Sequence, residues 1–357
     1  MQIPNLKLFF VLLGLMITQL SFAQYQIQVL DSNTFNRGEG VVLSKTSFRG
    51  LSVVDDNTIW ASGSRGTFAR STDGGKTFTY TQLKGYKKID FRDIEAFDDQ
   101  LAVMMSSGTP AYILKTTDGG LTWKEVYKNT DSAYFLDAMD FWDKQRGMIV
   151  GDPIYGHFVL LETKDGGETW QALDTTKIPR AMHGEAVFAA SGTSLRCIND
   201  SVVAFATGGS YARFFYSDNS ATTWKIIPTN AIHGKPSQGI FSITLNRSED
   251  GVTRITGIGG DYMQDTVKFK STVSWLNQTR KATITWHSPI TYKSSMEDLK
   301  FIPYTMVCGT SGVDMANYKK PYYQKISSEP FHVVRKAKKG NAVFLAGPNG
   351  KIGRFVY

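Results

Sequence analysis

Residues 71–78 read Ser-Thr-Asp-Gly-Gly-Lys-Thr-Phe, and near copies follow at residues 116–123 and 163–170, with a decayed copy at 217–224. The aspartates of the first three copies and the asparagine of the fourth are 45, 47 and 54 residues apart. A repeat length in the forties, with several short strands per unit, is typical of a β-propeller in which each unit forms one four-stranded blade.

Each copy has the composition of a hairpin turn. An aspartate carboxylate accepts hydrogen bonds from nearby backbone N–H groups, and the glycine pair provides the positive φ angles that a tight turn needs. The following Thr and the Phe or Trp return to a strand, where the ring can pack against a neighbouring sheet. This motif is the Asp-box, also called the bacterial neuraminidase repeat. A structural role is expected for Asp73, Gly75, Asp118, Gly120, Asp165 and Gly167.

The segments around the boxes repeat a rhythm of short alternating strands bounded by Gly, Asn and Asp. This rhythm predicts seven units, at residues 48–80, 91–127, 135–173, 184–228, 239–288, 296–327 and 331–357. The last unit has three strands, and the fourth is available at residues 25–30. We therefore predict an all-β, seven-bladed β-propeller of four-stranded blades, closed by an N-terminal strand, which removes the exposed sheet edges.

The first 23 residues have the pattern of an export signal. Lys7 precedes an apolar run at residues 8–20, and Ser21-Phe22-Ala23 is a site that signal peptidase accepts. We expect a cleaved signal peptide at 1–23 and a single propeller domain at 24–357 in the periplasm or outside the cell; an uncleaved membrane anchor is the alternative. No second apolar run approaches the length of a membrane span. Cys197 and Cys308 fall on non-neighbouring units, which favours two separate buried thiols over a disulfide.

Several strings of sequence are similar to one known family. They are residues 48–53, 59–63, 71–78, Gly151-Asp152-Pro153, Gly184-Glu185, residues 188–194 and Thr207-Gly208-Gly209. They resemble the exported bacterial relatives of the photosystem II stability and assembly factor propellers, over essentially the whole chain after residue 23. The resemblance implies a seven-bladed propeller that binds proteins or assists assembly. The photosynthetic members bind newly made photosystem II subunits, and nothing in this chain indicates that role.

Signals for enzyme chemistry are weak. Some relatives are labelled oxidoreductases, but residues 257–262 lack the third glycine of a dinucleotide-binding loop. Phe301-Ile302-Pro303 lacks the arginine of the sialidase segment that it resembles. The five histidines are too widely spaced for a metal site on one element, and Ser191 lacks the flanking pattern of a nucleophile elbow. We therefore predict no catalytic residue, cofactor or metal.

Loops from every blade converge on the mouth of a propeller's central funnel. A ring of like charges there would focus a field able to hold an acidic peptide or a carboxylate. Arg49 and Arg92 head innermost strands, and His183 and Glu185 lie in the connection entering the fourth blade. The loops after second strands supply the remaining candidates for the funnel face, which are Arg65, Asp152, Arg213, Asp261 and Asp314.

The prediction for function is a non-enzymatic, exported, monomeric factor that binds a protein or peptide of acidic character and assists assembly or scaffolding. The formal net charge is +8 and the pI about 9.2, but Lys and Arg are scattered, which argues against nucleic acid. The alternative is an Asp-box enzyme acting on glycans, a glycoside hydrolase or sialidase-like protein. It would need two carboxylates roughly 5–9.5 Å apart across the funnel, and the plausible suppliers are Asp152, Glu185, Asp261 and Asp314.

Overall fold

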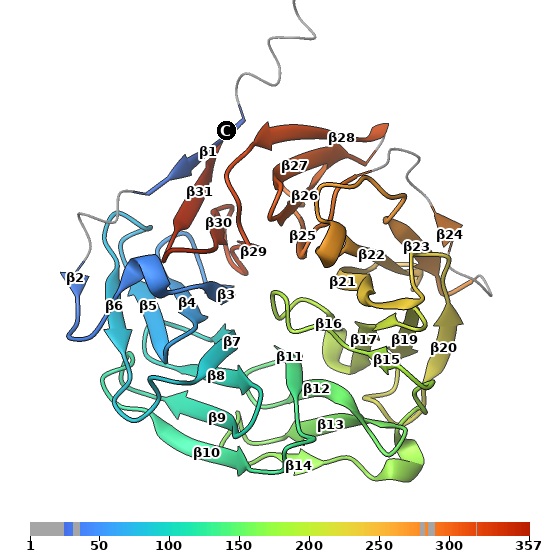
Figure 1. Ribbon diagram of the computed structural model, residues 1–357, viewed down its shortest axis with the longest axis horizontal. Helices are drawn as coiled ribbons and strands as arrows, with labels where there is room; N and C mark the ends of the chain where they lie inside the picture. The colour runs from blue at the N-terminus through green and yellow to red at the C-terminus, as the bar shows by residue number, and fades with distance from the viewer. Residues whose placement is uncertain (1–24, 31–35, 279–282, 285–289, 319) are drawn as a thin grey trace, which may run out of the picture.

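The computed structural model describes residues 25–30, 36–278, 283–284, 290–318 and 320–357. Seven antiparallel sheets stand around a central axis as the blades of a propeller (Figure 1), which confirms the predicted fold class. The helices of these residues are short 3₁₀ turns, namely η2 (Leu43–Lys45), η3 (Thr175–Lys177), η4 (Asn199–Ser201) and η5 (Tyr262–Gln264). Within the same ranges, no helix has the length and apolarity needed to cross a membrane. The expected signal peptide at 1–23 lies outside the described residues.

The blades follow one another along the chain, each running from an innermost to an outermost strand. Blade 1 has β3 (Phe48–Val53), β4 (Ile59–Gly63), β5 (Thr67–Ser71) and β6 (Thr79–Gln82). Blade 2 has β7 (Asp90–Ala96), β8 (Ala102–Ser107), β9 (Ala111–Thr116) and β10 (Lys124–Asn129). Blade 3 has β11 (Leu136–Phe141), β12 (Gly147–Ile154), β13 (His157–Thr163) and β14 (Gln171–Ala172). Blade 4 has β16 (Leu195–Ile198), β17 (Val202–Ala206), β19 (Arg213–Ser217) and β20 (Lys225–Pro228).

The remaining three blades complete the ring. Blade 5 has β21 (Lys235–Arg247), β22 (Thr253–Asp261), β23 (Val273–Leu276) and β24 (Thr283–Ile284). Blade 6 has β25 (Ser295–Asp298), β26 (Tyr304–Gly309), β27 (Gly312–Asn317) and β28 (Lys320–Ser327). Blade 7 has β29 (Val333–Lys336), β30 (Val343–Ala346) and β31 (Ile352–Val356), and its outermost strand is β1 (Gln26–Val29). β1 pairs antiparallel with β31, from Gln26 opposite Val356 to Val29 opposite Gly353, which confirms the closing strand.

Three short strands depart from the four-strand pattern. β2 (Asn36–Arg37) adds in parallel to the outer edge of blade 1. β15 (Glu185–Ala186) and β18 (Gly208–Gly209) extend the inner edge of blade 5. The fourth unit was predicted to begin at residue 184, but its first strand begins at Leu195, because residues 184–194 pair with blade 5 and then cross the centre of the ring.

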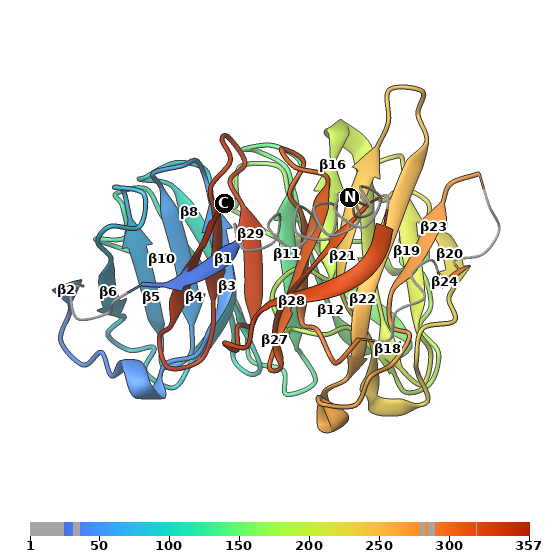
Figure 2. The same cartoon turned by 90° about the horizontal axis from the view of Figure 1, so that it is seen from above.

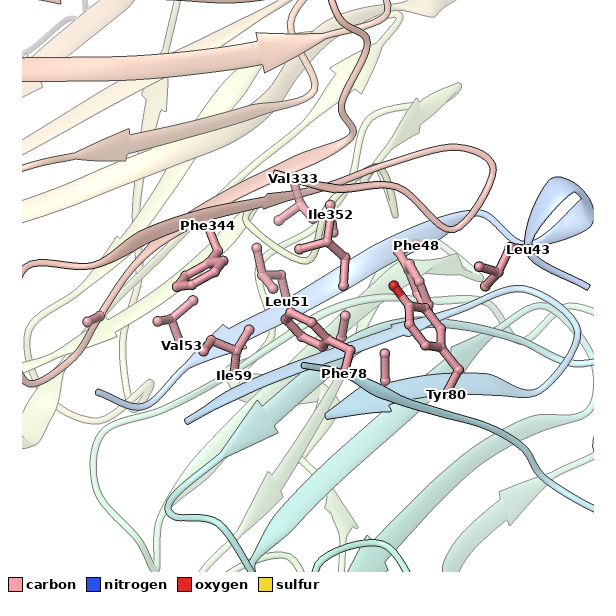
Figure 3. Packing of buried hydrophobic residues seen from close by; sticks show 14 residues of the cluster. Leu43, Phe48, Leu51, Val53, Ile59, Phe78, Tyr80, Val333, Phe344 and Ile352 are labelled. Atoms are coloured by element: carbon pink, nitrogen blue, oxygen red, sulfur yellow. The ribbon is translucent and has the colours of Figure 1, made fainter. Parts of the chain in front are cut away.

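Hydrophobic side chains fill the spaces between neighbouring blades. At the closing interface, Phe344, Ile352 and Val333 of blade 7 pack against blade 1, where Leu51 and Phe78 are fully buried (Figure 3). Burying one such side chain contributes about 1.5–3 kcal/mol. Cys197 and Cys308 are both buried and unpaired, and they belong to blades 4 and 6.

The Asp-box turns connect third and fourth strands. The carboxylate of Asp118 accepts hydrogen bonds from the backbone N–H of Thr122 at 2.9 Å and from its hydroxyl at 2.5 Å. These bonds lower the pKa of Asp118 to about 2. Gly120 has φ +85°, and a Cβ atom there would lie 2.8 Å from the Phe68 ring of blade 1. The second glycine of the box thus permits both the turn and close contact with the preceding blade.

Side-chain oxygens also join the innermost strands of neighbouring blades. In each case a serine hydroxyl or an aspartate carboxylate accepts a hydrogen bond from a backbone N–H group in the innermost strand of the next blade. The pairs are Ser52 with Ala96, Asp93 with Met139, Asp140 with Cys197, Ser242 with Met296, and Ser295 with Val334, at 2.7–3.2 Å.

Candidate binding site in the central funnel

Four innermost strands carry a β-bulge at the same place. The pairing of β3 with β4 skips Arg49, that of β7 with β8 skips Arg92, and that of β11 with β12 skips Asp137. In blade 5 the pairing of β21 with β22 skips Phe241. A bulge leaves one residue out of the ladder and redirects its side chain. All four bulged residues line one central cavity of about 490 Å³.

The cavity opens on the face formed by the entries to first strands and the turns after second strands. Its polar lining also includes Asp152 near the end of β12, Tyr262 after β22 and His332 before β29. The long β21–β22 hairpin projects from the opposite face (Figure 2). The cavity therefore opens on the side of the ring where the bulges lie.

The inner end of the cavity is formed by residues 187–194, which we call the central segment; Figure 1 shows the loop before β16 reaching the middle of the ring. Arg49 Nη1 donates to the Ala190 carbonyl at 3.2 Å, and Arg92 Nη1 donates to the Ala189 carbonyl at 3.3 Å. Ser191 Oγ donates to the Ser294 carbonyl at 2.7 Å. The central segment is thus bonded to blades 1, 2 and 6.

Charged groups on one side of the cavity are partly desolvated. Burial raises the pKa of Asp137 well above its usual range, the charge of Asp152 raises it further, and Arg92 opposes both effects. Burial also raises the pKa of Asp152 to about 6. The pKa of His332 falls to about 3 through burial and the nearby charges of Arg49 and Arg92. The two arginines therefore face a neutral His332 and an Asp137 carboxyl group whose protonated form is favoured by burial.

Aromatic rings form the other side. Phe188 of the central segment stacks on Phe241, with ring centroids 3.8 Å apart. Tyr292 meets Phe241 edge-on at 4.9 Å, and Tyr262 does so at 6.1 Å. The cavity therefore has a charged wall, made of Arg49, Arg92, Asp137, Asp152 and His332, and an aromatic wall, made of Phe188, Phe241, Tyr262 and Tyr292.

Of the nine residues that the sequence placed on the funnel face, the structure brings Arg49, Arg92 and Asp152 together in this cavity. Buried Glu185 instead forms an ion pair with Arg213, whose Nε donates to Glu185 Oε1 at 2.8 Å. Asp314 pairs with the buried Lys293 at 2.6 Å. The charges of Glu185, Arg213 and Asp314 are therefore paired within the protein.

The other three candidates lie apart from the cavity lining. Asp261 is buried and accepts a hydrogen bond from Gln238 Nε2 at 3.0 Å. Arg65 sits in the β4–β5 turn with φ +64°, where its carbonyl accepts from Gln82. His183 is exposed, and its carbonyl accepts from Ser210 Oγ.

Sequence reasoning did not identify Asp137, His332 or the four rings of the aromatic wall as site residues. A local signal exists for the bulged positions: each follows a large apolar residue at the head of an innermost strand. The pairs are Phe48-Arg49, Phe91-Arg92, Leu136-Asp137 and Ile240-Phe241.

Exposed apolar side chains also lie in the connections of blades 3 to 5 on the face that carries the cavity mouth. Tyr155 in the β12–β13 turn is 97% exposed, and Met263 after β22 is 73% exposed. Met182, Tyr211 and Tyr262 are also exposed, in the segments between β14 and β15, between β18 and β19, and after β22. We call these five residues the apolar rim. Gathered apolar side chains on an otherwise polar surface mark interaction sites.

Comparison with known proteins identifies the family. Residues 89–283, more than half of the chain, match the family model described as photosynthesis system II assembly factor YCF48. The chain belongs to this family. A curated relative from Arabidopsis thaliana, the chloroplastic photosystem II stability/assembly factor HCF136, is 28% identical over 168 residues. That match covers 44% of this chain and only 40% of the length of the relative.

Solved structures of the YCF48 family have the same fold. The structure of YCF48 bound to D1 peptide aligns over 94% of this chain and 95% of its own, with a TM-score of 0.59 and 13% identity. YCF48 from Cyanidioschyzon merolae aligns over 93% of this chain and 99% of its own, with a TM-score of 0.56 and 13% sequence identity. The WD40 propeller domain of Doa1 aligns over 94% of this chain and 97% of its own, with a TM-score of 0.58 and 12% sequence identity. At these identities the likeness concerns the fold alone.

Proposed function

We propose that this protein is an exported, non-enzymatic monomer that binds a segment of another protein on its funnel face and acts as an assembly or scaffolding factor. Membership of a family described as an assembly factor supports this proposal. So does a propeller of the same fold whose structure contains a bound peptide. The observation in this chain that carries it is the position of the apolar rim beside the mouth of a cavity lined by Arg49 and Arg92.

The chemistry of the face indicates the chemistry of the partner. Apolar and aromatic side chains at the rim gain by being removed from water, whereas arginines in a partly desolvated cavity favour carboxylates. An extended segment that presents apolar side chains beside an acidic group satisfies both. Such a segment can bind without a large change in the propeller, since the cavity is already formed.

Affinity capture from a cell-envelope extract tests the proposal. The test variant is Tyr155→Ser with Met263→Ser, because both side chains are exposed and support no core packing. The control is Leu121→Ser, an 87% exposed residue in the β9–β10 turn, which lies on the opposite face. A partner retained by wild type and control but lost by the rim variant, and then mapped to one peptide segment, is the expected result. A partner retained equally by all three contradicts binding on this face.

The glycan-active alternative requires two carboxylates that face each other across the funnel. Of the four that the sequence offered, Glu185 and Asp314 are in ion pairs and Asp261 is bound to Gln238. Asp152 remains in the cavity beside Asp137, and burial raises the pKa of both carboxyl groups. Turnover of a glycoside panel by wild type but not by Asp152→Asn would favour this alternative over peptide binding.

A further inference from the structure

One member of the charged wall, Asp137, lacks a hydrogen-bond partner among the described residues. Asp137 is fully buried, and within the described parts of the chain neither of its side-chain oxygens has a hydrogen-bond partner. The N–H groups of Ala189 and Asp152 lie near enough to lower its pKa, but neither is aligned as a hydrogen bond. A buried polar group without a partner is costly and rare. Because Asp137 lines the cavity, a bound molecule can supply that partner.

The two guanidinium groups also keep donors free. Among the described residues, Arg49 donates one hydrogen bond, to Ala190, and Arg92 donates two, to Ala189 and Asp90. A guanidinium has five N–H donors in a planar fork that matches a carboxylate. Arg92 forms an ion pair with Asp90 at 2.8 Å, whereas no ion pair of Arg49 is found among the described residues, and burial together with the charge of Arg92 lowers the pKa of Arg49. An anion placed between them relieves this repulsion.

The opposite wall has a different requirement. Phe241 and Tyr292 are almost fully buried, and Tyr262 stands half exposed at the mouth. Their rings meet edge to face and all three line the cavity, so an aromatic ring placed in the cavity would contact them. A cavity of about 490 Å³ has the size of a small-molecule pocket, in which apolar walls bind and a few polar groups orient the ligand.

We propose that the cavity binds an aromatic ring that carries a carboxylate. The carboxylate lies between Arg49 and Arg92 and accepts a hydrogen bond from the Asp137 hydroxyl, and the ring lies against Phe241, Tyr262 and Tyr292. This inference rests on the funnel face being the binding face, and it names the chemistry recognised there. Two sources have this chemistry: a free aromatic acid, and the C-terminal aromatic residue of a protein partner.

Calorimetric titration of the purified protein with defined probes tests the assignment. The probes are N-acetylphenylalanine, its C-terminal amide, acetate, phenyl phosphate and 3-phenylpropionate. N-acetylphenylalanine should bind at least about tenfold more tightly than the amide, acetate or phenyl phosphate. Equal affinity for the amide or for acetate, tighter binding of phenyl phosphate, or no saturable binding of any aromatic acid overturns the proposal.

The source of the carboxylate follows from one further probe, a peptide that ends in phenylalanine, compared with 3-phenylpropionate. A peptide ending in phenylalanine that binds at least about tenfold more tightly than 3-phenylpropionate assigns the cavity to a chain end. Equal binding of the two assigns it to a free aromatic acid. Either result supports the shared chemistry, because both ligands present a ring and a carboxylate.

Variants locate the binding. Tyr262→Ala should weaken N-acetylphenylalanine several-fold, whereas Tyr322→Ala, a matched exposed tyrosine on β28, should leave it unchanged. Asp137→Asn should retain binding, since the amide still donates, and Asp137→Leu should lose it. Unaltered affinity in both Tyr262→Ala and Asp137→Leu places the ligand elsewhere. If the rim variant loses the protein partner while no aromatic acid binds, the proposed function stands and this inference fails.

Discussion

Gly192 of the central segment lies directly against the carboxyl group of Asp93: a Cβ atom on Gly192 would stand 2.2 Å from Asp93 Cγ. Gly192 also has φ +67°, a conformation that L side chains rarely adopt. The close approach lets the segment cross the middle of the ring beneath the cavity.

Replacement of Gly192 by alanine should therefore destabilise the protein. Backbone strain and overpacking together predict a loss of about 2–4 kcal/mol in the free energy of unfolding, measured by urea denaturation. Gly156→Ala is the matched control, because Gly156 has φ +79° but nothing within 4 Å of the added Cβ. The control should lose only about 1–2 kcal/mol in the free energy of unfolding, because backbone strain is its only cost. Equal losses in the two variants would show that the contact with Asp93 is unimportant.

Asp118→Ala should lower the melting temperature, since the turn loses the acceptor for both the N–H and the hydroxyl of Thr122. Asp118→Asn should lower it less. The decayed fourth box shows why: Asn219 accepts from the Thr223 N–H at 3.0 Å and donates to the Thr223 hydroxyl at 2.8 Å. Partner binding by the folded fraction should be unaffected in both variants. Loss of binding at unchanged melting temperature would contradict a structural role.

The raised pKa of Asp152 predicts a pH dependence of stability. Its pKa is about 6 in the folded protein and about 3.9 when unfolded. Protonated Asp152 thus favours the folded state, and this contribution is present below pH 4 and is lost as the pH rises through 6. One pKa unit corresponds to about 1.4 kcal/mol. Asp152→Asn should flatten this decline and stabilise the protein at pH 8, measured by urea denaturation across the pH range. An unchanged slope would show that Asp152 is solvated.

Arg213→Met should destabilise the protein strongly, because it leaves the buried carboxylate of Glu185 without its cation. Removing one partner of a buried pair costs about 3–5 kcal/mol. The double variant Glu185→Gln with Arg213→Met should be less destabilised than the single variant, and a double-mutant cycle by denaturation measures the difference. Additive effects of the two changes would show that the pair is solvated and structurally unimportant.

The fold was predictable because it depends on local signals that recur. The Asp-box turns fix one hairpin in each of four blades, and the shortage of one strand at the C-terminus indicated where residues 25–30 must go. Arg49 and Arg92 were predictable for the same reason, since both head innermost strands at matching positions.

The rest of the site depends on features without a distinct sequence signal. A bulge adds one residue to a strand, and the large apolar residue that precedes Asp137 or Phe241 also precedes many regular strand positions, so this weak signal does not single out the residue that leaves the ladder. Residues 187–194 were read as part of the fourth unit because a segment that crosses the ring has the same apolar and small residues as a strand. Glu185, Arg213, Asp261 and Asp314 have the charge expected of binding residues, but each has a partner in a neighbouring element that sequence spacing does not reveal.

The pairing of β1 with β31 sets the order of events during synthesis. Gln26 lies opposite Val356, so β1, which is synthesised first, can pair only after nearly all of the chain has been synthesised. At about 5–20 residues per second, this delay is roughly 20–70 s. During that time six blades can form, while β1 remains an unpaired strand with free backbone groups and the ring remains open. The delay creates a requirement for a chaperone, or for a folding rate of the last blade fast enough to capture β1 before another strand does.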